Sequence, residues 1–245
     1  MVSKIAKWHF APTESSRQNL LDERTPDQNI TVTGNTVIDA LFWVLKRIEG
    51  DATKRTQLEA FLNQRLPFDW AKQRFVLITG HRRENFGDGF LAICEAIRQL
   101  AATHPEVHFV YPVHLNPNVQ QPVFELISGQ PNIHLIDPLE YEPFVFLLKH
   151  AYLVLTDSGG IQEEAPSLGK PVLVMREVTE RPEAVEAGTV RLVGADTAKI
   201  VQHVSELLKD ETAYASMSKA HNPYGDGLAA KRITTVFETL KRNVS

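Results

Sequence analysis

Short apolar runs rich in β-branched residues alternate along this chain with longer segments of helical period. Each run is four or five residues long and is bounded by turn-forming or polar residues, which is typical of buried strands. The predicted strands are residues 75–79, 107–111, 133–136, 152–156, 171–175 and 190–193.

The segments between these runs have apolar residues spaced by three and four, which predicts helices. The predicted helices are residues 89–102, 118–128, 144–150, 161–168 and 197–208. A strand followed by a helix, repeated several times, indicates a mostly parallel, doubly wound sheet. The sequence therefore predicts the α/β fold class.

Residues before about position 66 follow this rhythm less clearly. The pattern predicts a strand ending at 9–12, a helix at 14–23, a strand at 30–33 and a helix at 36–48. Two repeats are fewer than the three strands expected of a self-sufficient layer. We interpret residues 1–66 as the remnant of an amino-terminal domain with an interdomain connection; a genuine extension is the alternative.

The remaining chain divides at a turn-rich segment, residues 222–227. Residues 67–221 are predicted to form a ligand-binding domain. A helix at 229–240, with apolar residues on one side, is predicted to cross a domain boundary, so that residues 222–245 form a third section.

Composition narrows the class of function. A hydrophobic share of 43%, a charged share of 23% and a net charge of −4 fit a soluble globular protein and argue against an extended nucleic-acid surface. The single cysteine, Cys94, lies in an apolar helical segment, which excludes disulfides and cysteine-based metal sites. Without an apolar run of membrane length or a secretory signal, we expect a cytoplasmic protein with small-molecule partners.

The turn after residue 156 is the first candidate for chemistry, because ligands of parallel sheets bind beyond the carboxyl ends of the strands. Ser158, Gly159 and Gly160 precede a predicted helix, so free N–H groups and the serine hydroxyl can hold an anion such as a diphosphate. Glu164, one turn later, can accept hydrogen bonds from a vicinal diol such as a ribose. The alternative is that Ser158 caps the helix while Glu163 and Glu164 are solvated acids.

Two further strand-end loops carry cationic side chains. His81, Arg82 and Arg83 crowd the loop at 80–87 with Glu84, where they could neutralise a second phosphate or a leaving diphosphate; a polar loop with mutual ion pairs is the alternative. Arg181 stands before Pro182 at a predicted helix start and can reach phosphate.

Two other strand-end loops face the same edge of the sheet. His114 lies on a proline-stiffened loop, where a lone histidine is ordinarily structural. The loop at 138–144 can clamp a flat base through backbone groups and Phe144.

Taken together, a linked set of motifs resembles the non-hydrolysing bacterial UDP-N-acetylglucosamine 2-epimerases over essentially the whole chain. The motifs are Gly-Asn-Thr at 34–36, Thr-Gly-His-Arg-Arg-Glu-Asn at 79–85, Thr-Asp-Ser-Gly-Gly-Ile-Gln-Glu-Glu-Ala at 156–165, Glu-Arg-Pro-Glu at 180–183 and Asn-Pro-Tyr-Gly-Asp-Gly at 222–227. The resemblance implies the two Rossmann-like domains of GT-B glycosyltransferases. It also implies interconversion of UDP-N-acetylglucosamine and UDP-N-acetylmannosamine, by anti elimination of UDP and its re-addition, without a cofactor or metal.

The resemblance also implies roles for individual residues. His81 would stabilise the leaving group, and His114 with Arg82 or Arg83 would contact a second, regulatory UDP-N-acetylglucosamine. The UDP would be held by His81, Leu139, Phe144, Ser158, Gly159, Gly160, Glu164 and Arg181.

The sequence departs from the family in one respect. Its start resembles the last part of the amino-terminal domain, and the family's acid/base carboxylates precede the segment that matches residues 9–16. We therefore expect the carboxyl-terminal two-thirds of an epimerase, with little or no turnover alone. A non-catalytic UDP-sugar-binding module and a GT-B glycosyltransferase donor domain are the alternatives; a homodimer is compatible with all three.

Overall fold

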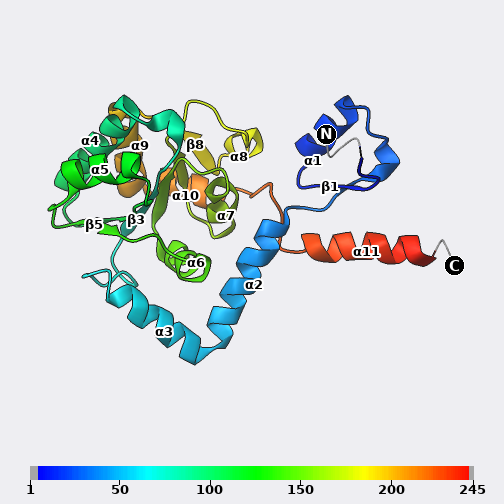
Figure 1. Ribbon diagram of the computed structural model, residues 1–245, viewed down its shortest axis with the longest axis horizontal. Helices are drawn as coiled ribbons and strands as arrows, with labels where there is room; N and C mark the ends of the chain where they lie inside the picture. Colours follow the sequence, from blue (N-terminus) through cyan, green and yellow to red (C-terminus); the bar gives the residue numbers. More distant parts are fainter. Residues whose placement is uncertain (1–4, 243–245) are drawn as a thin grey trace. The chain divides into compact units, whose positions relative to one another are not determined.

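The computed structural model describes residues 5–242, with side chains described up to residue 239 (Figure 1). By its internal contacts the chain divides into two compact units. One consists of the chain up to Arg47 together with the segment from Asn222 onward, and the other is Ile48–His221.

The larger unit contains a six-stranded sheet in which every pairing is parallel. Its strands stand in the order β5-β4-β3-β6-β7-β8. They are β3 (Phe75–Thr79), β4 (His108–Pro112), β5 (Ile133–Ile136), β6 (Leu153–Thr156), β7 (Val172–Val174) and β8 (Val190–Leu192). The predicted α/β class and all six predicted strands are confirmed, with ends that differ by at most one residue.

Helices connect the strands as predicted. They are α4 (Asp88–Thr103), α5 (Pro117–Ile127), α6 (Tyr141–His150), α7 (Ile161–Ser167), α8 (Pro182–Glu186) and α9 (Thr197–Lys209). One expectation is wrong: residues 138–144 are not all loop, because α6 already begins at Tyr141. Pro143 falls in the first turn of α6, where its missing N–H costs no intrahelical hydrogen bond.

Two α-helices were not predicted from the sequence, α3 (Ala52–Asn63) and α10 (Glu211–Ser218). Each begins after an aspartate whose carboxylate accepts backbone N–H bonds: Asp51 caps α3, and Asp210 caps α10. α3 buries just two leucines, Leu58 and Leu62, among its described residues, so its apolar pattern is weak.

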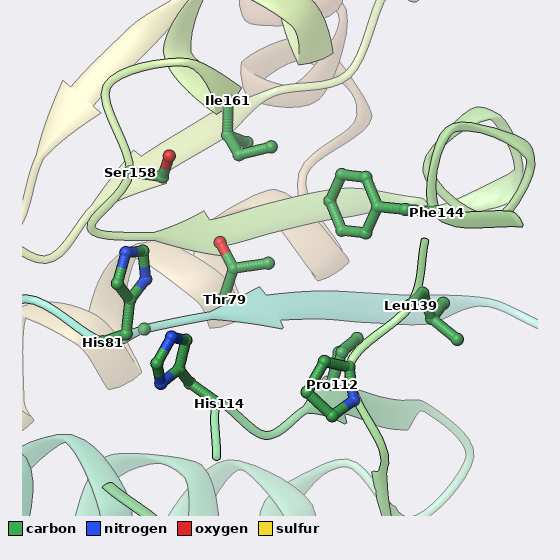
Figure 2. A pocket seen from close by; sticks show the side chains of 10 residues that line it. Thr79, His81, Pro112, His114, Leu139, Phe144, Ser158 and Ile161 are labelled. Atoms are coloured by element: carbon green, nitrogen blue, oxygen red, sulfur yellow. The ribbon is translucent and has the colours of Figure 1, made fainter. Parts of the chain in front are cut away.

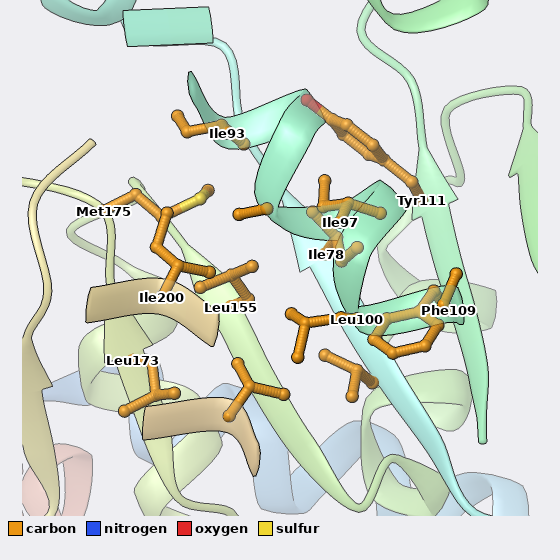
Figure 3. Close-up of a cluster of buried hydrophobic side chains, with 14 of the residues drawn as sticks. Ile78, Ile93, Ile97, Leu100, Phe109, Tyr111, Leu155, Leu173, Met175 and Ile200 are labelled. Carbon is orange, nitrogen blue, oxygen red and sulfur yellow. The ribbon is translucent and has the colours of Figure 1, made fainter. Parts of the chain in front are cut away.

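The main apolar core lies between one face of the sheet and helices α4, α5 and α9 (Figure 3). Val76 and Ile78 of β3 point into it, whereas Phe75 and Leu77, equally buried, must face the opposite side because side chains alternate along a strand. The central strand is therefore covered on both faces. Cys94 is fully buried in this core, as predicted, and burial raises the pKa of its thiol to about 12.

The smaller unit contains β1 (His9–Ala11), α1 (Glu14–Asp22), β2 (Ile30–Val32), α2 (Thr36–Gly50), which runs on into the larger unit, and α11 (Ala229–Arg242). β1 and β2 pair in parallel. The motifs at 34–36 and 222–227 meet here: Asn35 N donates to Tyr224 O over 2.8 Å, and Gly34 and Gly225 pack backbone against backbone. Asp39 accepts the N–H groups of Ala229 and Ala230 and so caps the start of α11.

Candidate functional site

A pocket of about 220 Å³ opens at the carboxyl ends of the central strands (Figure 2). It lies where the strand order reverses between β3 and β6, the place at which doubly wound sheets bind their ligands. Thr79 and Thr156 end these two strands side by side, with their hydroxyl oxygens 2.6 Å apart. The pocket is lined by Thr79, Gly80, His81, Pro112, His114, Pro138, Leu139, Phe144, Ser158 and Ile161.

Asp157 holds the loop that follows β3. This carboxylate is fully buried, and its Oδ2 accepts the backbone N–H groups of His81 and Arg82 over 2.9 and 2.8 Å. Its Oδ1 finds no hydrogen-bond partner among the described residues and lies 3.8 Å from Nδ1 of His81. Tyr111 supports the same loop by donating to Gly80 O over 2.9 Å. Neither Asp157 nor Tyr111 was predicted from the sequence to have a role, although both stand at strand ends.

His81 and His114 form one wall of the pocket. Their rings stack with centroids 5.1 Å apart and planes 13° from parallel, and Figure 2 shows them side by side. Nδ1 of His114 accepts the N–H of Asn116 over 3.1 Å, so this nitrogen carries no proton in that bond. The structure thus brings together two histidines that the family resemblance assigned to different sites.

The first N–H groups of α7 have no side-chain cap. The helix is capped at Gly160, which has no side chain to bond them, and the hydroxyl of Ser158 lines the pocket. The alternative interpretation of Ser158 as the helix cap is therefore wrong. Its N–H is instead tied to Thr156 Oγ1 over 2.9 Å, which fixes the turn.

Arg181 lies against Gly159. A β-carbon added at Gly159 would stand 3.2 Å from the guanidinium carbon of Arg181, so the absence of a side chain admits the arginine at this turn. Nε of Arg181 donates to Oε1 of Glu163 over 2.9 Å. Glu163 and Glu164 are 6% and 8% exposed, so the interpretation of both as solvated acids is also wrong.

Glu164 has a partner that the sequence analysis did not identify. The hydroxyl of Tyr141, the first residue of α6, donates to Oε1 of Glu164 over 2.7 Å. Burial raises the pKa of Glu164, the hydrogen bond from Tyr141 opposes this rise, and the charge of Glu163 adds to it. A tyrosine at a helix start gave no signal in the sequence, because its partner lies on the next helix.

Arg176 joins the two cationic loops. Its guanidinium, 5% exposed, donates to Glu84 over 2.5 Å and to both carboxylate oxygens of Glu180 over 2.7 and 3.0 Å. The bond from Arg176 holds the pKa of Glu180 at about 2. Arg82 and Arg181 each approach Glu180 to 3.9 Å, and Arg83 has an exposed side chain. The acid at 84 thus pairs with an arginine of another loop rather than with its own neighbours.

No group of three or more His, Cys, Asp or Glu side chains in residues 5–242 is arranged to hold a metal ion. No helix in the same range is long and apolar enough to cross a membrane.

This fold and pocket define a Rossmann-like domain with a pocket at its switch point. Residues 1–238 match the sequence profile of the Epimerase_2 family, described as UDP-N-acetylglucosamine 2-epimerase, and the chain belongs to this family. The UDP-N-acetylglucosamine 2-epimerase of Yersinia pestis is 60% identical over 233 residues, which are 95% of this chain and 61% of that protein.

Solved structures show the same likeness. The UDP-GlcNAc 2-epimerase of Neisseria meningitidis, solved bound to UDP-GlcNAc, is 49% identical with a TM-score of 0.89 over 97% of this chain and 62% of its own. The Staphylococcus aureus MnaA–UDP structure is 40% identical, with a TM-score of 0.87 over 98% of this chain and 62% of its own. The chain thus spans about three-fifths of the length of these relatives, and its solved neighbours are of the GT-B type.

Proposed function

We propose that this chain is the UDP-binding part of a UDP-N-acetylglucosamine 2-epimerase. The observation that carries the proposal is that Ser158 and His81 line a pocket on the switch point of the sheet, while Arg181 lies against Gly159 of the same turn. Backbone N–H groups at a helix start, a guanidinium and an imidazole are the groups that hold a diphosphate. The relatives solved with UDP-GlcNAc and with UDP support the choice of ligand.

Within this proposal each side of the pocket holds one part of the nucleotide. Ser158, Gly159, Gly160 and Arg181 hold the diphosphate, and Glu164 accepts the ribose hydroxyls. The apolar side, Leu139 and Phe144, lies against the uracil; Figure 2 places Phe144 on α6, across the pocket from the histidines.

In the reaction, C2 of the sugar loses a proton while the C1–O bond to UDP breaks. The UDP oxygen then re-forms its bond to C1 on the face that it left, and a proton returns to the opposite face of C2, so that C2 alone is inverted. His81 stabilises the negative charge that appears on the departing diphosphate, which is where catalysis by fixed charges acts. The buried carboxylates near the pocket are engaged: Asp157 with the loop backbone, Glu163 with Arg181 and Glu164 with Tyr141. None is placed as a base for C2, so we expect slow or no turnover by this polypeptide alone.

The proposal extends to regulation, location and oligomeric state. Arg82 and Arg83, together with His114, contact a second UDP-N-acetylglucosamine that regulates the reaction. The protein acts in the cytoplasm, in line with a single buried cysteine, and needs no cofactor. A homodimer is compatible with it.

Calorimetric titration with UDP and with UDP-N-acetylglucosamine tests the proposal. We expect both to bind with dissociation constants below about 1 mM, about −4 kcal/mol, and we expect Glu164→Ala to weaken both. A chromatographic assay should find little or no UDP-N-acetylmannosamine. If neither ligand binds, the proposed binding site is refuted. Epimerisation at an ordinary enzymatic rate of about 10 per second would refute the expectation that this polypeptide, with His81 but no base for C2, turns over slowly or not at all.

Gly159 of the turn and Gly50, the last residue of α2, give a matched pair of variants. In Gly159→Ala the new methyl group would press on the guanidinium of Arg181, so UDP affinity should fall about 3- to 10-fold, or about 0.7 to 1.4 kcal/mol. Gly50 has no positive φ and nothing within 4 Å of an added β-carbon, so Gly50→Ala should bind UDP like the wild type. Equal affinities for the two variants would contradict the proposed place of Arg181 at the diphosphate.

A further inference from the structure

Tyr141 links two helices at the edge of the pocket. It starts α6, between Leu139 and Phe144, two residues that line the pocket. Its hydroxyl donates to Oε1 of Glu164 over 2.7 Å, and Glu164 lies one turn after Ile161, another lining residue. The hydrogen bond therefore ties α6 to α7 beside the pocket.

We infer that Tyr141 is a positioning residue that orients the Glu164 carboxylate to accept the ribose hydroxyls of the nucleotide. The inference rests on the proposed function and adds a residue to it. An ionised carboxylate has two oxygens with about four acceptor sites. Because the Tyr141 hydroxyl occupies one site on Oε1, the rotation of the carboxylate is fixed and the other sites remain for a ligand. Fixing the group before binding removes part of the entropy that binding would cost.

The charge states of the pair suit this role. Burial raises the pKa of Tyr141 well above its ordinary value, and Glu164 raises it further, so the phenol keeps its proton and remains a donor at physiological pH. Glu164 is the acceptor and must be ionised. The other charged groups that face it are Glu163 on its own helix and Arg181 at the start of α8, which pairs with Glu163.

Removing the phenol hydroxyl has a predictable effect on Glu164. The hydrogen bond from Tyr141 lowers the pKa of Glu164 against the effects of burial and of Glu163. In Tyr141→Phe this stabilisation of the ionised form is lost, so the pKa rises further and Glu164 becomes protonated at a higher pH than in the wild type. A protonated carboxyl has fewer acceptor sites for a diol, so affinity is lost on the acid side.

The test compares affinities for UDP-N-acetylglucosamine by calorimetry between pH 5 and pH 8. This ligand is preferred to UDP because it has no terminal phosphate with a second pKa near 6. Tyr141→Phe should bind about 3- to 10-fold more weakly than the wild type at pH 7, a charge-assisted hydrogen bond being lost. The ratio of the two dissociation constants should rise as the pH falls, and fall again where Glu164 is protonated in both proteins. Contributions of His81 and His114 cancel in this ratio.

Two controls separate positioning from a structural role. Tyr214→Phe removes a hydroxyl that donates to Tyr152 O over 3.0 Å, outside the pocket, and should bind like the wild type at every pH. In a Glu164→Gln background, Tyr141→Phe should leave the ratio independent of pH, because residue 164 no longer titrates.

The outcomes are distinguishable. Wild-type protein that does not bind the nucleotide overturns the proposed function and the inference with it. Normal binding by the wild type, with a Tyr141→Phe to wild-type ratio that is flat across the pH range, overturns the inference alone. A ratio that peaks on the acid side and becomes flat in the Glu164→Gln background supports it.

Discussion

Replacing Asp157 with alanine is expected to lower the free energy of unfolding of the Ile48–His221 unit by about 2–4 kcal/mol. The substitution leaves two backbone N–H groups, those of His81 and Arg82, without their acceptor. It also removes the acceptor of a weaker bond from the amide of Asn85, 3.4 Å away. The cost of burying the carboxylate, whose Oδ1 finds no hydrogen-bond partner among the described residues, offsets part of the loss.

Urea denaturation, followed by far-ultraviolet circular dichroism, measures this loss against a matched control. Asp210 also accepts two backbone N–H groups, but it is an exposed helix cap, so Asp210→Ala should cost about 1 kcal/mol. Asp157→Asn keeps one acceptor oxygen, so its loss in the free energy of unfolding should lie between those of Asp157→Ala and Asp210→Ala. A loss for Asp157→Ala no larger than that for Asp210→Ala would mean that water replaces the carboxylate and that the loop does not depend on it.

Arg181→Ala should weaken UDP binding by about 100-fold, or about 2.7 kcal/mol, the largest effect expected for any single residue of the proposed diphosphate site. Two causes act together. The variant loses the cation placed against Gly159, and Glu163, 6% exposed, loses its ion pair with Arg181 close to the diphosphate. A buried carboxylate that has lost its cation repels the anionic ligand.

Calorimetry with UDP, on single and double variants, separates the two causes. Glu163→Gln in the Arg181→Ala background should recover part of the affinity, because it removes the repulsion without restoring the cation. Arg181→Lys should lose about 10-fold, since it keeps the charge without the planar fork. Arg98→Ala, which breaks an exposed pair with Glu95 on α4, should bind normally. An Arg181→Ala protein with unchanged affinity would remove this residue from the proposed diphosphate site.

Much of the fold followed from the sequence because its elements are strongly patterned. The central strands of the large sheet, β3, β6 and β7, are buried along nearly their whole length, and apolar runs such as residues 75–79 have few other structures open to them. The helices α3 and α10 were missed because their patterns are weak and their starts depend on single aspartates, Asp51 and Asp210. The early start of α6 was missed because Pro143 was taken to belong to a loop.

The residues of the candidate site were largely predictable from the sequence, but the contacts between their side chains were not. The strand-end rule and the linked motifs pointed to Ser158, Glu164, Arg181 and His81, three of which border the same turn or pocket. Nothing local indicated that Arg176 would join Glu84 to Glu180, because the acids lie 92 and four positions away and their side chains meet through the fold. For the same reason, the sequence left open whether Ser158 was a cap and whether Glu163 was solvated.

The sequence by itself determined the alternation of strands and helices and placed glycines and charged residues at strand ends, since propensity and apolar period act over a few residues. The tertiary structure decided which of those residues share a pocket. Asp157 holds the histidine loop, Arg181 rests on Gly159 and Tyr141 reaches Glu164 because packing the sheet brings these distant positions within hydrogen-bonding distance. Such contacts depend on side-chain directions and on burial, which are fixed when the core closes.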